Sequence, residues 1–143
     1  MIFIGMDDTD TAETRGTGAL ARNVAAALSE RYTVLGVIRQ QLLRDPRVPC
    51  TKTNSSKALL LADGQAVELE ELAAEVRALM LSDFIPGSDP GLCVVRDVPP
   101  EVVELGRRAQ RELRAKADSE ALAARQGISR EEPGGDGIGS TGA

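Results

Sequence analysis

The sequence MIFIGMDDTD, residues 1–10, decides the fold. Residues 2–6 are apolar and too few for a stable helix, so they predict a buried strand. The strand leads directly into the acidic turn 7–10, and the chain behind that turn has apolar residues at helical spacing over 17–31, with Gly16 or Thr17 at its start. The turn is therefore expected between a strand end and a helix start.

The same periodicities predict the remaining elements. Apolar and β-branched runs predict strands over 33–42, 57–61 and 92–95, and an apolar face predicts a helix over 66–81. The order β-α-β-β-α-β is typical of a ferredoxin-like α+β fold, with an open α/β sheet as the alternative.

Two extra helices are expected after this core. Pro99-Pro100 opens the first, and the second runs from Ser119 to Gly127. Residues 1–127 would then form one domain, followed by a glycine-rich tail, 128–143, that is either a flexible end or a phosphate-binding loop.

Composition narrows the function classes. The 143 residues include 22 acidic and 17 basic side chains, a formal net charge of -5, which argues against general affinity for a nucleic-acid backbone. One Tyr, two Phe and no Trp leave no set of rings for stacking bases, and His is absent. Carboxylates, hydroxyls and lysines remain, an inventory that suits hard cations and phosphate.

The cysteines and the hydropathy indicate a cytoplasmic protein. Cys50 and Cys93 are too few for a disulfide framework, and no stretch resembles a signal peptide or a membrane span. We expect no membrane partner, and the sequence leaves homo-oligomerisation open.

Asp7, Asp8 and Asp10 are the first candidate site residues. Three carboxylates within four positions repel one another unless a cation lies among them, which predicts Mg²⁺ ligands. Aspartates are also common in turns and at helix N-caps, so capping is the alternative interpretation.

Hydroxyls and backbone amides near these acids favour phosphate. Thr9 lies in the turn, and Gly16, Thr17 and Gly18 lie at the expected helix start, where backbone amides attract anions. The alternative is that Thr17 only caps the helix and the two glycines supply flexibility. A second polar segment precedes the strand at 57–61 and contributes the candidate ligand contacts Lys52, Asn54, Ser55 and Ser56.

These motifs together resemble the N-terminal domain of archaeal tRNA-isoleucine agmatinylcytidine synthetase. The resemblance rests on GMDDTD at 5–10, the helix start at Thr17, the loop 46–56 and the terminal GIGSTGA at 137–143. It covers most of the chain and implies a kinase-like module, as a stand-alone or truncated relative without the agmatine- and RNA-binding modules.

The resemblance implies an ATP site. Asp7, Asp8 and Asp10 become Mg²⁺ ligands, Thr17 aligns with a threonine that is phosphorylated in that family, and the nucleotide contacts include Lys52 and Asn54 together with the tail glycines Gly137 and Gly139. tRNA would be a partner only with other modules present.

The sequence therefore predicts a Mg²⁺-dependent ATP- or nucleotide-binding domain, an ATP-dependent phosphotransferase or ligase-like enzyme that catalyses phosphoryl transfer or nucleotide hydrolysis. The catalytic candidates are Asp7, Asp8, Asp10 and Thr17. The alternative is a non-catalytic domain that binds a small phosphorylated ligand or a protein partner.

Overall fold

A computed structural model describes residues 1–48, 50, 53–64, 67–128 and 130–133. The described strands form one sheet in the order β2-β3-β1-β4-β5, and every neighbouring pair is antiparallel. This arrangement confirms the ferredoxin-like α+β prediction and excludes the open parallel sheet. The elements are β1 (Ile2–Asp7), α1 (Thr17–Leu28), β2 (Val34–Gln41), β3 (Ser55–Leu61), α2 (Leu69–Ser82), β4 (Gly91–Arg96), α3 (Pro100–Ala109), α4 (Lys116–Gln126) and β5 (Arg130–Glu131).

The first strand lies at the centre of the sheet, between β3 and β4. Its side chains alternate between the two faces, so Ile2, Ile4 and Met6 share one face and are all 0% exposed. The apolar stripes of α1 and α2 pack on this face, where they contribute Leu20, Val24, Leu28, Leu72, Val76 and Met80 to the core.

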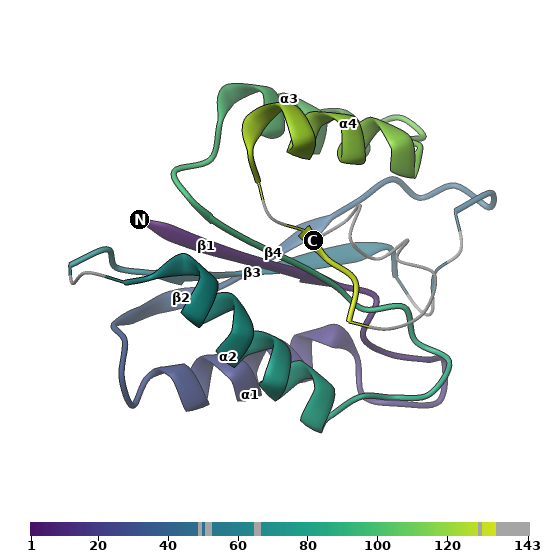
Figure 1. Cartoon of the computed structure of the whole chain (residues 1–143). Helices are drawn as coiled ribbons and strands as arrows, with labels where there is room; N and C mark the ends of the chain where they lie inside the picture. Colours follow the sequence, from purple (N-terminus) through teal and green to yellow (C-terminus); the bar gives the residue numbers. More distant parts are fainter. Residues whose placement is uncertain (49, 51–52, 65–66, 129, 134–143) are drawn as a thin grey trace.

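The helices lie on both sides of the sheet (Figure 1). α1 and α2 cover the face that carries Ile2 and Ile4, while α3 and α4 lie across the opposite face. No side chain of α3 is buried and α4 buries Ser119, Leu122 and Ala123, so this layer buries fewer side chains than α1 and α2 do. No helix in the described part of the chain combines the length and apolarity needed to cross a bilayer.

Most predicted elements begin and end within three residues of the observed ones. α1 ends at Leu28 rather than at 31, and α2 begins at Leu69 rather than at 66. Gly127 ends α4 as predicted, with φ at 63°, a left-handed conformation that glycine adopts without strain. β5 was not predicted; it pairs Glu131 with Leu92 and Arg130 with Cys93.

Candidate functional site

The acidic turn lies at the carboxyl end of β1, where the chain leaves the middle of the sheet. Asp8 has φ at 50°, a left-handed conformation that is uncommon for a residue with a side chain. Its N–H donates to Asp7 Oδ1 at 2.9 Å, and its carbonyl accepts from the Asp89 N–H at 3.0 Å. The loop between α2 and β4 therefore holds the turn, and Asp89 acts there through its backbone.

Thr17, the first residue of α1, joins the turn to the helix. Its hydroxyl donates to Asp10 Oδ1 at 3.1 Å and accepts the Thr9 N–H at 3.4 Å. Thr17 is 4% exposed, so these contacts hold its oxygen in one position. The structure thus brings together three of the predicted residues, and a carboxylate lies within reach of the threonine proton.

The first turn of α1 has no side-chain cap. The N-cap is Gly16, which has no side chain to bond the amides of the first turn. These amides and the helix dipole give this end of α1 a partial positive charge that attracts anions. A Cβ on Gly16 would lie 3.7 Å from Asp10 Oδ2, which places the acid directly beside the N-cap.

Asp7 occupies an unfavourable position for a lone carboxylate. Burial raises the pKa of Asp7 from 3.8 to about 7, because desolvation disfavours the charged form. The Asp8 N–H and the positive charge of Lys57 lower this pKa, while the negative charges of Asp8 and Asp10 raise it further. A cation beside Asp7 would favour its charged form.

The three aspartates do not converge on one point. In the part of the chain that the structure describes, no three acidic or cysteine side chains are placed to hold a metal ion together. Alternation along β1 puts Asp7 on the face opposite Met6, whereas Asp10 lies beside the α1 N-cap. Mg²⁺ is commonly held by one or two carboxylates together with substrate phosphates, and these residues fit that form of binding.

A buried hydroxyl in the turn lacks a partner. Thr9 is only 6% exposed, and its Oγ1 is shielded from solvent and makes no hydrogen bond with the described residues. Such a group costs about 1–3 kcal/mol. An unmet hydrogen bond between the acids and the helix start is consistent with a ligand site at this turn.

The candidate residues of the second polar segment differ in what their side chains contact. Asn54 Nδ2 donates to the Leu43 carbonyl at 2.8 Å, so this side chain ties the loop to the chain after β2. Ser55 lies on the same face of β3 as Lys57, and its carbonyl and hydroxyl oxygens accept hydrogen bonds from the Lys57 ammonium. Ser56 lies on the other face. Lys52, Gly137 and Gly139 lie outside the described residues.

Lys57 is a candidate site residue that the sequence analysis did not name. It is 8% exposed on β3, opposite Met6 of β1, and its Cε lies 3.6 Å from the position a Gly18 Cβ would take. A lysine just before an apolar run resembles the polar margin of a strand. Only the register, which aligns Lys57 with the last core residue of β1, indicates that it is buried near the acids.

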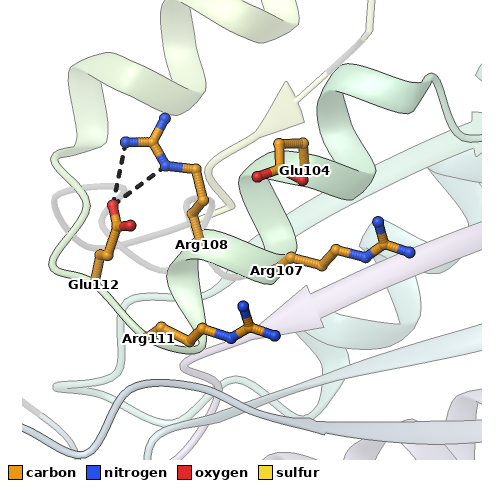
Figure 2. A pocket seen from close by; sticks show the side chains of 5 residues that line it. All are labelled: Glu104, Arg107, Arg108, Arg111 and Glu112. Atoms are coloured by element: carbon orange, nitrogen blue, oxygen red, sulfur yellow. Dashed lines mark hydrogen bonds and ion pairs between the residues drawn. The ribbon is translucent and has the colours of Figure 1, made fainter.

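A separate hollow of about 570 Å³ lies along α3 (Figure 2). It is lined by side chains of α3 and the turn that follows, among them Arg108, which bonds Glu112 at 3.1 Å. The full lining is Glu104, Arg107, Arg108, Arg111 and Glu112. None of these was a predicted site residue, and the acidic turn does not contribute to the hollow.

Comparison with known proteins finds relatives by structure and not by sequence. No family model matches the chain, and no curated protein matches it. The solved structure described as a tRNA fluorescent labeling enzyme superimposes with a TM-score of 0.84 at 18% identity. The structure of apo TiaS, the tRNAIle2 agmatidine synthetase, superimposes with a TM-score of 0.83 at 18% identity. The TiaS complex with tRNA(Ile2) and ATP superimposes with a TM-score of 0.79 at 20% identity.

Each match covers 99% of this chain but only 34% of the solved chain. The chain therefore spans about a third of the length of these proteins. At 18–20% identity the likeness demonstrates the fold alone. The resemblance to the agmatinylcytidine synthetase family is thus confirmed at the level of architecture: this chain has the fold of one part of that synthetase.

Proposed function

We propose that the acidic turn and the start of α1 form a Mg²⁺-dependent nucleotide site for phosphoryl transfer. The observation that carries this proposal is the bond from the Thr17 hydroxyl to Asp10 at 3.1 Å, made at an uncapped helix N-terminus. A hydroxyl with a base in reach, beside amides that attract phosphate, is the arrangement that phosphoryl transfer requires. The fold of a synthetase solved with ATP supports the choice of nucleotide.

The roles of the residues follow from their positions. Mg²⁺, when bound, would neutralise charge on the phosphates, and Asp7, Asp8 and Asp10 are its candidate ligands. Thr17 either orients the terminal phosphate or accepts it. As acceptor, its Oγ bonds to the terminal phosphorus, the bond from phosphorus to the bridging oxygen breaks, the diphosphate leaves, and the Thr17 proton passes to Asp10.

Calorimetry with Mg²⁺ and ATP tests the binding half of the proposal. Wild type should bind, while Asp8→Asn and Asp10→Asn should bind more weakly. Mg²⁺ alone should give little heat, because the three acids do not converge without a phosphate. Equal heats for wild type and both variants, or no binding by wild type, would contradict the site.

Intact mass after incubation with Mg²⁺ and ATP tests the chemical half. Wild type should gain one phosphoryl group or release phosphate, and Asp10→Asn should slow this by about 10²- to 10⁴-fold. Thr17→Val should abolish the mass gain. Ser82→Ala removes an exposed hydroxyl at the end of α2 and serves as the matched control.

A non-catalytic nucleotide-binding domain is the second candidate. The divergence of the three acids favours it, because a site that holds a cation only through phosphate can bind without activating an acceptor. Calorimetric binding with no product over several hours would identify this case. By the same likeness, tRNA would be a partner only with further modules, since this chain spans about a third of the solved synthetase.

A further inference from the structure

Lys57 carries a buried positive charge that feels the charges of Asp7 and Asp10 but makes no direct ion pair with a described residue. Its ammonium donates to the Ser55 carbonyl at 2.7 Å and to Ser55 Oγ at 3.1 Å. An ammonium has three N–H groups, so at least one remains for a further acceptor. Burying an ammonium without a direct ion pair is costly, and charged residues buried in this way often serve a ligand.

The Lys57 stem runs along the first turn of α1. Its Cε lies 3.6 Å from where a Gly18 Cβ would be, and Arg22 Nη1 lies at the same distance from that point. Two cations therefore flank the residue that follows Thr17, at the end of the helix whose dipole is positive. Glycine at 18 leaves this space free of a side chain.

Arg39 adds a third cation from the neighbouring strand. It is directly opposite Lys57 in the pairing of β2 with β3, so both side chains lie on the same face of the sheet. Its Nη2 donates to Gln41 Oε1 at 2.9 Å and to Thr53 Oγ1 at 3.2 Å, both neutral. Burial and the positive charge of Arg39 lower the pKa of Lys57, while the negative charges of Asp7 and Asp10 raise it. The cations and acids together suit a phosphate with bound Mg²⁺, because the cations attract phosphate oxygens and the acids attract the metal ion.

We infer that Lys57, assisted by Arg22 and Arg39, binds the terminal phosphate of a nucleoside triphosphate at the start of α1. This inference rests on the proposed function. The group transferred to or oriented by Thr17 must lie against its hydroxyl, and Lys57 lies against the next residue, Gly18. Lys57 thus recognises the phosphate that ATP has and ADP lacks, so it determines preference for the triphosphate.

Calorimetry with Mg-ATP and Mg-ADP on wild type and Lys57→Met tests this assignment. Wild type should prefer ATP. Lys57→Met should lose ATP affinity by about tenfold or more, because a hydrogen bond between charged groups is lost, and should retain ADP affinity. Lys57→Arg should recover part of the preference. Lys116→Met removes a lysine of α4 that pairs with Glu132, and its ATP-to-ADP ratio should equal that of wild type.

The outcomes separate the two proposals. If wild type binds neither nucleotide, the proposed function fails and this inference fails with it. If wild type binds both and Lys57→Met keeps the wild-type ratio, only this inference is overturned. Should Lys57→Met not fold, Arg22→Gln and Arg39→Gln, both at exposed positions, decide the matter. Each should reduce ATP affinity more than ADP affinity, and an unchanged ratio in both would overturn the assignment.

Discussion

Asp8 shows at the scale of one residue how the turn combines strain with charge. Its φ of 50° is tolerated better by Asp or Asn than by a β-branched residue. Asp8→Val should therefore destabilise the protein by about 1–2 kcal/mol in urea unfolding, whereas Asp8→Asn should change little. Asp97, which also has a left-handed backbone with φ at 58°, is the matched control position for the Asp8 variants. Asp97→Val should cost a similar amount but leave Mg-ATP binding unchanged, whereas both Asp8 variants should weaken that binding.

The raised pKa of Asp7 predicts an unusual pH dependence of the protein's stability. Burial raises its folded pKa to about 7, so the folded protein holds a proton that the unfolded chain releases above 3.8. The Asp7 contribution to stability therefore falls as pH rises from 3.8 to about 7, and is level above that. Without divalent cations, Asp7→Asn should remove this slope and stabilise the protein at pH 8 by a few kcal/mol, about 1.4 for each pKa unit.

Urea unfolding at pH 5 and pH 8 in a chelator measures this effect. Glu30→Gln, which neutralises an exposed acid after α1, serves as the control and should keep the wild-type slope. An Asp7→Asn variant with the wild-type slope, or with lower stability at pH 8, would contradict the burial of a lone carboxylate. Saturating Mg-ATP should reduce the difference in stability between Asp7→Asn and wild type at pH 8. Ligand binding stabilises the wild-type protein fully and the variant only in part.

At the scale of the element, the sequence predicts what local periodicity controls. The alternation of Ile2, Ile4 and Met6 and the spacing of Leu20, Val24 and Leu28 each follow from one buried face, so β1 and α1 were predictable. β5 was not, because Arg130 and Glu131 have no strand pattern and form a strand only by pairing with β4. Short polar strands depend on tertiary partners rather than on propensity.

The contacts of the candidate site also differ in whether local sequence could predict them. The contact between Asp10 and Thr17 spans seven residues and was predictable from a turn followed by a helix start. Lys57 is fifty residues from Asp7 in sequence, and only the antiparallel register of β1 with β3 brings it to the acids. Long-range pairing is the information that a single sequence lacks, and it changes the site from three acids into acids beside cations.

At the scale of the whole molecule, the two layers of helices should differ in how well they protect the sheet. Cys93 of β4 lies between Gly5 and Arg130 in the sheet, and burial raises its pKa to about 11, whereas Cys50 is exposed. At pH 8, alkylation followed by peptide mass analysis should label Cys50 first. Cys93 should react about a hundredfold more slowly, because a rise of two pKa units lowers its thiolate fraction by that factor.

The slow Cys93 reaction then reports on the layer formed by α3 and α4. α3 has no fully buried side chain, so this layer should open at lower urea concentration than the core under α1 and α2 unfolds. Cys93 labelling should accordingly accelerate before the unfolding transition seen by circular dichroism. In Cys50→Ser, which isolates the Cys93 signal, coincidence of the two transitions would instead mean that both layers unfold as one cooperative unit.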